Sequence, residues 1–301
     1  QSALAGAARA AKAASPRTAT HTSTSGAAAP ATVNDVPRIL IRLPPTATSP
    51  SAWLVTAPGD PSSRTPMVAP FVDLVLGPAS ADGSILATTA GQALTVRLDG
   101  SELVPVSAVP LPAGHALLPA CYAGDGRALF AEAETLGLVA LTDGVVEPFS
   151  AVAFTLGECA ALADGRTLVA VDGGGLVAVG PAGVSAPIVG ALGRHLSAAG
   201  RRLVMIDPAT EFGEAIVREG TVGEDGSLGA VIGAVAGGPG GRVADARSSP
   251  DGHWLAVILE RETPTGADAR LRVYRIGDDG LTAVTENALE VGARITVLAD
   301  P

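Results

Sequence analysis

Several residue types are scarce in this chain of 301 residues, and each scarcity narrows the possible classes of protein. Phe, Trp and Tyr together make up 3% of the residues, so a core has to be built from Val, Leu, Ile and Ala. No run of 18 or more residues is continuously apolar, which argues against a membrane-spanning helix. The longest apolar runs, such as Leu228 to Val235, are short and interrupted by glycine.

Positive charge is also scarce. Lys and Arg number 20 against 30 Asp and Glu, the formal net charge is −10, and Lys12 is the only lysine. A nucleic-acid-binding protein normally presents a basic face, so this balance argues against nucleic acid as a partner. Hydrophobic residues still make up 47% of the chain and charged residues only 17%, which is too apolar for a protein disordered throughout.

The first 34 residues differ in composition from the rest. Residues 1–34 are mostly Ala, Ser, Thr, Gly and Pro and contain no Asp or Glu. Arg9, Lys12 and Arg17 give this segment a side-chain charge of +3, which leaves −13 for the remaining residues. We therefore predict an extended, low-complexity basic arm over residues 1–34 and a folded domain over residues 35–301.

From Val36 onward, short apolar segments alternate with Gly, Pro, Asp and Ser, a pattern typical of many short strands. Asp-Gly pairs, which suit hairpin turns because both positions can adopt positive φ, recur through this region. Anchors of this kind lie near residues 51, 82, 125, 164, 199 and 251. Their average spacing of about 40 residues is the period of a four-stranded propeller blade.

The last of these units carries a resemblance to a known family. Its residues are Ser249-Pro250-Asp251-Gly252-His253-Trp254-Leu255-Ala256, followed by Leu271-Arg272-Val273-Tyr274. They resemble the WD40-like repeat of TolB-type β-propellers. The match is partial in three other units and poor around residues 51 and 199. This resemblance implies a fold and brings no catalytic residues with it.

These observations predict an all-β protein with a six-bladed β-propeller. Seven blades and a pair of packed sheets are the alternatives, the first because Glu290 to Leu298 adds a strand beyond the last full unit. We expect this late segment to share a blade with Arg38 to Leu43, which would tie the chain ends together. One leucine per anchor is expected to occupy an equivalent buried position: Leu86, Leu129, Leu168, Leu203 and Leu255.

Two cysteines lie just before the anchors of adjacent units. Cys121 is four residues before Asp125 and Cys159 is five before Asp164, a difference of one residue that could turn one side chain to the opposite face. The chain begins with Gln1, either an arbitrary boundary or a mature N-terminus after removal of a signal peptide. We expect the second, hence an exported protein outside the cell or at its surface, and with export a disulfide between the cysteines.

Residues able to carry chemistry are few. The sequence has four histidines without metal-binding spacing, no Gly-x-Ser-x-Gly motif and no phosphate-binding loop, so we predict no catalytic residue, cofactor or metal site. Four residues are candidates to face the central channel: His115 and His195, before inner strands, and Arg242 and Asp245 in the last inner strand. Their alternative roles are packing, loop positions and a local ion pair.

The sequence therefore favours an exported, non-catalytic propeller that acts as an interaction or structural protein. Two alternatives stay open: a propeller enzyme of the lactonase or lyase type with a site at the channel, and a TolB-like adaptor that binds an extended segment of a partner. The arm adds a specific expectation. If Thr18 to Ser25 pairs with an outer strand of another copy, head-to-tail assembly follows. Pairing within one molecule would instead protect an edge, and the third alternative is a disordered arm.

Overall fold

The computed structural model describes residues 35–46, 51–71, 73–149, 155–171, 175–185, 187–188, 193–207, 213–238 and 240–299. Contacts divide the chain into two units, Gln1–Pro30 and Ala31–Pro301. The predicted arm, with Arg9, Lys12 and Arg17 as the residues expected to contact an acidic surface, lies outside the described residues, so the boundary at residue 34 and the role of the arm stay predictions.

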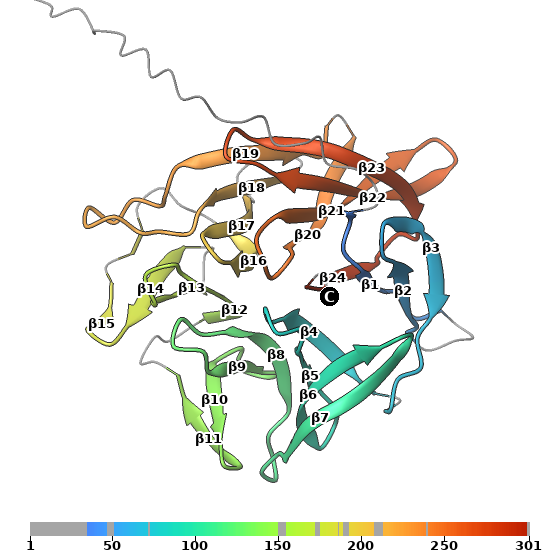
Figure 1. Cartoon of the computed structure of the whole chain (residues 1–301). Coiled ribbons are helices and arrows are strands. Elements are labelled where there is room, and N and C mark those ends of the chain that lie inside the picture. The colour runs from blue at the N-terminus through green and yellow to red at the C-terminus, as the bar shows by residue number, and fades with distance from the viewer. Residues whose placement is uncertain are drawn as a thin grey trace, which may run out of the picture. The chain divides into compact units, whose positions relative to one another are not determined.

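The described residues form 24 strands in six antiparallel sheets of four strands each (Figure 1). Blade 1 consists, from the inside outward, of β24 (Arg294–Val297), β1 (Ile39–Arg42), β2 (Trp53–Ala57) and β3 (Asp60–Pro66). Blade 2 consists of β4 (Val75–Ala79), β5 (Ile85–Thr88), β6 (Gln92–Asp99) and β7 (Glu102–Pro110). Blade 3 consists of β8 (Leu117–Tyr122), β9 (Ala128–Glu132), β10 (Leu138–Thr142) and β11 (Val145–Pro148).

The other three blades repeat this order. Blade 4 consists of β12 (Thr155–Ala161), β13 (Thr167–Val171), β14 (Leu176–Gly180) and β15 (Gly183–Val184). Blade 5 consists of β16 (Arg194–Ala199), β17 (Arg202–Asp207), β18 (Glu214–Glu219) and β19 (Val231–Ala236). Blade 6 consists of β20 (Gly241–Ser248), β21 (Trp254–Thr263), β22 (Gly266–Ile276) and β23 (Leu281–Leu289). Within the described part of the chain, no helix is long and apolar enough to span a membrane.

The six-bladed propeller predicted from the anchor spacing is confirmed (Figure 1). The predicted sharing of blade 1 by the two chain ends is confirmed as well. β24 pairs with β1 from Ile39 opposite Val297 to Arg42 opposite Arg294, and the Leu298 N–H donates to the Arg38 carbonyl at 3.0 Å. The last strand therefore closes the ring on the first.

One hydrophobic cluster fills each of the six seams between neighbouring blades. The members alternate along each strand because successive side chains point to opposite faces of a sheet. In β13, for example, Leu168 and Ala170 face blade 5, whereas Val169 faces blade 3. Small and β-branched side chains let sheets that are buried on both faces pack closely, which explains how the chain builds its core with few aromatic residues.

The Asp-Gly turns form by a mechanism that differs from the expected one. The glycine of all eight pairs has positive φ, but Asp143 is the only aspartate among them that does. At Asp82, Asp125, Asp164, Asp225 and Asp251 the carboxylate instead accepts the backbone N–H of the residue two positions later, at 3.0–3.1 Å. Aspartate is therefore used here as a side-chain acceptor that closes the turn.

The five anchor leucines are all buried, but they do not occupy equivalent faces. Leu86, Leu129 and Leu168 pack toward the following blade, whereas Leu203 and Leu255 pack toward the preceding one. The cause is the length of the turn before each leucine. In blades 2–4 the leucine lies two residues after the closing pair of the turn; in blades 5 and 6 it lies one residue after. A slip of one residue turns a strand side chain to the other face.

Candidate functional site: the central cavity

A cavity of about 240 Å³ lies on the propeller axis, where the six inner strands converge. Five of these strands, all except β24, carry an irregularity in their pairing with the second strand of the blade. Such bulges re-aim side chains and are frequent beside functional sites. The wall is partly apolar, and its polar members come mainly from blades 1, 3, 5 and 6: Arg42, Tyr122, Ser197, Asp245, Arg247, Ser248, Arg294 and Thr296.

Asp245, on β20, is the buried charge of this wall, with 1% of its side chain exposed. Its Oδ2 accepts the Ile295 N–H of blade 1 at 3.0 Å, and its Oδ1 accepts the adjacent Ala246 N–H at 3.0 Å. The Arg247 Nε lies 3.2 Å from Oδ1 and supplies the counter-charge. A buried carboxylate needs such partners to remain ionised, and here they join blade 6 to blade 1.

Glu158, on β12, plays the corresponding part between blades 4 and 5. Its Oε2 accepts the backbone N–H of His195 at 2.5 Å. His195 itself has φ of 53°, a left-handed conformation that is uncommon outside glycine. Burial and the nearby Arg247 lower the pKa of the imidazole, although Asp245 and Glu158 act in the opposite direction. His195 is therefore expected to be neutral at pH 7.

The residues predicted to face the channel do not gather in one place. Asp245 lines the cavity, and the His195 Nδ1 lies 3.9 Å from its Oδ1. His115 instead pairs with Glu132 through Nδ1 at 2.9 Å. Arg242 pairs with the Glu260 Oε2 at 2.6 Å. His195, His115 and Arg242 are outside the set of described residues that line the cavity.

Glu260 is a buried carboxylate that the sequence analysis missed. Burial alone would raise its pKa, but the Gly292 N–H and the Arg242 guanidinium reverse this and hold the pKa below its ordinary value. The Gly292 N–H donates to Glu260 Oε1 at 2.7 Å, from the loop that leads into β24. Glu260 thus also connects blade 6 to the closing strand. The sequence does not reveal this burial, because Glu260 and Glu262 are spaced as acidic residues on one exposed face of a strand would be.

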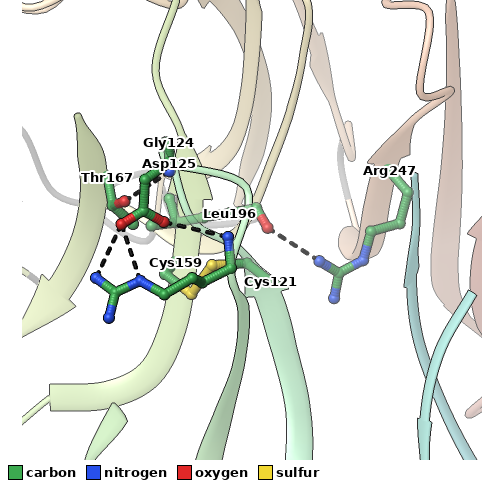
Figure 2. Close-up of a disulfide and its surroundings, with 8 residues drawn as sticks. Cys121, Gly124, Asp125, Cys159, Thr167, Leu196 and Arg247 are labelled. Atoms are coloured by element: carbon green, nitrogen blue, oxygen red, sulfur yellow. Dashed lines mark hydrogen bonds and ion pairs between the residues drawn. A yellow bond between two sulfur atoms is a disulfide. The ribbon is translucent and has the colours of Figure 1, made fainter. Parts of the chain in front are cut away.

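Cys121 and Cys159 form a disulfide between the inner strands of blades 3 and 4, and both line the cavity (Figure 2). Both are buried. The same seam is joined by the Gly124 N–H, which donates to the Thr167 Oγ1 at 2.9 Å (Figure 2). Arg247, also shown in Figure 2, donates to the Leu196 carbonyl at 3.1 Å and so connects blades 6 and 5.

A row of side chains on blade 1 was also missed. Arg294 on β24, Arg42 on β1 and Trp53 on β2 are directly opposite one another in consecutive strands, and all three line the cavity. The predicted pairing of the late segment with Arg38 to Leu43 identifies the two strands but not their register, because a shift of two residues would bury the same isoleucines. In the observed register Arg42 lies opposite Arg294.

Burial raises the pKa of the Tyr122 phenol, which therefore stays protonated at the cavity wall near pH 7. The cavity thus offers guanidinium groups, hydroxyls and apolar surface to a ligand. Among the described residues, no group of three or more His, Cys, Asp and Glu side chains is placed to hold a metal ion.

Known proteins resemble this chain in fold and not in sequence. No family model matches the sequence, and no curated protein matches it. The solved structure of a putative TolB from Agrobacterium tumefaciens is 12% identical, with a TM-score of 0.51, and the match covers 84% of this chain and 90% of that one. At this identity the likeness shows the fold alone, and on that level the predicted resemblance to TolB-type propellers is confirmed.

Two further solved structures are similar at lower TM-scores. A Lactobacillus plantarum protein is 13% identical, with a TM-score of 0.46, over 86% of this chain and 98% of its own. A gluconolactonase from Xanthomonas campestris is 15% identical, with a TM-score of 0.44, over 83% of this chain and 80% of its own.

Proposed function

We propose that this chain is an exported, non-catalytic β-propeller that acts by binding other proteins, including further copies of itself. The proposal rests on the carboxylates of the inner strands, which form hydrogen bonds between blades. Glu158 and Asp245 are the acidic residues of these strands, and both accept a backbone N–H from the next blade. Each therefore uses a carboxylate oxygen to link two neighbouring blades.

The disulfide supports the exported part of the proposal. Disulfides persist in oxidising compartments and are uncommon in the cytosol. Cys121 and Cys159 join two inner strands that are 38 residues apart in the sequence, so the bond stabilises the ring at a seam. A protein that works outside the cell gains from such a covalent link.

Self-association is the form of binding that can be tested without knowing a partner. Residues 1–34 carry three positive side chains, and the rest of the chain carries −13. A positively charged segment is attracted to an acidic surface. At 0.1 M salt this attraction is largely screened beyond about 10 Å. A contact of one copy's segment with another copy's blade repeats from copy to copy and yields a ring or a filament.

The test compares the particle mass of residues 1–301 with that of residues 35–301 by light scattering over a range of protein concentrations. The shorter chain keeps both strands that close the ring, β1 and β24. The proposal predicts that the full chain associates and the shorter chain is a monomer. A full chain with Arg9→Gln, Lys12→Gln and Arg17→Gln serves as a control for charge and is expected to associate more weakly. Equal masses for the full and shortened chains would contradict association through this segment.

A further inference from the structure

The two arginines of the blade 1 row are placed unfavourably for the protein alone. Arg42 and Arg294 face each other in an antiparallel strand pair, where Cβ atoms are about 5 Å apart and like charges destabilise the sheet. Arg42 is half-buried and makes a long contact of 3.5 Å with the Ser51 Oγ. Arg294 donates to the carbonyl of its own neighbour, Ala293. Among the described residues neither forms an ion pair within 4 Å, and the exposed Arg294 acts only at longer range on the Glu260 carboxylate, whose pKa it helps to lower.

The charge of the cavity is opposite to the charge of the protein. Its ionised lining side chains are Arg42, Arg294, Arg247 and Asp245, so the wall carries +2 in a chain of net charge −10. Arg247 already neutralises Asp245, with its Nε 3.2 Å from Oδ1. The excess of two positive charges therefore belongs to Arg42 and Arg294. Guanidinium groups are suited to carboxylates, which they bind with two parallel hydrogen bonds.

The remainder of the wall indicates an organic ligand. Trp53 continues the row beyond Arg42, and Leu76, Pro119 and Leu196 add apolar surface from blades 2, 3 and 5. A volume of about 240 Å³ is slightly below that of typical drug-sized ligand sites and fits a small metabolite. An inorganic anion would satisfy the arginines and leave this apolar surface without a partner.

We infer that the central cavity binds a small organic dicarboxylate, held by Arg42 and Arg294 against the apolar wall that blades 1, 2, 3 and 5 provide. The ligand's two negative charges would neutralise the excess charge of the wall. This site goes beyond the proposed function and does not depend on it, because a ligand can be bound there without being converted and whether or not the chain self-associates.

The experiment is calorimetric titration of the full chain with succinate, against sodium chloride and phosphate at matched ionic strength and against the neutral analogue succinamide. We expect saturable binding of succinate alone. The double variant Arg42→Gln, Arg294→Gln is expected to bind at least about tenfold more weakly, since each lost charge-assisted pair contributes a factor of that order. Arg201→Gln, which removes an exposed arginine in a turn of blade 5, is the control and should bind as the unaltered chain does.

A second measurement separates loss of binding from loss of folding. Without ligand, the double variant should melt no lower than the unaltered protein, because the substitution removes a like-charge pair. Succinate should raise the melting temperature of the unaltered chain and of Arg201→Gln but not that of the double variant. Equal responses to succinate and chloride, an unchanged response in the double variant, or equally tight binding of phosphate would each overturn the inference.

Discussion

At the scale of single residues, the recurring device is a carboxylate that accepts a backbone N–H. In the anchor turns, Asp82, Asp125 and Asp164 each accept the N–H of the residue two positions later. In the cavity wall, Asp245 does the same for an N–H of the neighbouring blade. The acidic residues of this chain are therefore partly structural, and their protonation should weaken the fold.

The turn at Asp164 makes this testable with pH. The Arg166 side chain and the Arg166 N–H hold the pKa of Asp164 below its ordinary value of 3.8, against a smaller opposing effect of burial. A carboxylate with a lowered native pKa stabilises the fold above its unfolded pKa, and that contribution is lost as the pH falls through the native pKa. Asp164→Asn should therefore lower the urea midpoint at pH 7, and the difference from the unaltered protein should shrink on acidification below 3.8.

Urea unfolding of both proteins at neutral and acidic pH checks this expectation. Glu224→Gln removes an equal charge from an exposed position in a turn of blade 5 and serves as the control. A difference for Asp164→Asn that stays constant with pH would show that the effect of the substitution is unrelated to ionisation.

Gly124 offers a second test at this scale, through close approach of backbones. A Cβ at this position would lie 2.1 Å from the Gly165 carbonyl oxygen and 2.5 Å from that of Arg166, both in the next blade. Gly124→Ala should therefore force blades 3 and 4 apart and lower the free energy of unfolding by about 1–3 kcal/mol or more. Gly91→Ala is the matched control, because nothing lies within 4 Å of its Cβ position, and it should be neutral or slightly stabilising. Equal effects of the two substitutions on chemical denaturation would refute the close approach.

At the scale of elements, the register of the inner strands decides which side chains meet. Cys121 is opposite Leu129, the second residue of β9, whereas Cys159 is opposite Val169, the third residue of β13. This offset of one residue turns the two side chains to opposite faces of their sheets. One face of each blade packs against the opposite face of the next blade. The offset therefore turns the two sulfurs toward each other across the seam.

The disulfide should contribute substantially to stability because it closes a loop of 38 residues. In the chain-entropy description, a loop of this length corresponds to about 4 kcal/mol. The double variant Cys121→Ser, Cys159→Ser should unfold at a correspondingly lower denaturant concentration, and a reducing agent should destabilise the unaltered protein but not the variant. Two titratable thiols in unreduced, denatured protein would contradict the pairing.

At the scale of the whole molecule, the propeller is a ring joined at each seam near its axis. The disulfide joins blades 3 and 4, Glu158 joins 4 and 5, and a pair of serine hydroxyls, Ser197 and Ser248, joins 5 and 6 at 2.9 Å. Asp245 joins blades 6 and 1, and the Thr296 Oγ1 donates to the Gly77 carbonyl between blades 1 and 2 at 3.1 Å. Blades 2 and 3 meet where Gly77 packs against Pro119.

Much of this ring was predictable from the sequence, and the failures have physical causes. The repeat spacing predicted six blades, and the match of the end segments predicted the closing blade, because both depend on pattern alone. The faces of Leu203 and Leu255 depend on the number of residues in a turn, which the aligned motif conceals. The cavity wall depends on bulges that are set by packing between blades. Glu260 and Asp245 therefore gave no sign of being buried acceptors.

Hydrogen–deuterium exchange of Asp245→Asn is the sharpest test of whether the carboxylates at the axis link the blades. Asparagine removes the negative charge opposite Arg247 and one of the two acceptor oxygens. We expect faster exchange in β24 and β20, at the Ile295 N–H above all, with β8 and β12 at the disulfide seam unchanged. Exchange in the variant that matches the unaltered protein throughout β24 would show that the Asp245 carboxylate does not hold blade 1 to blade 6.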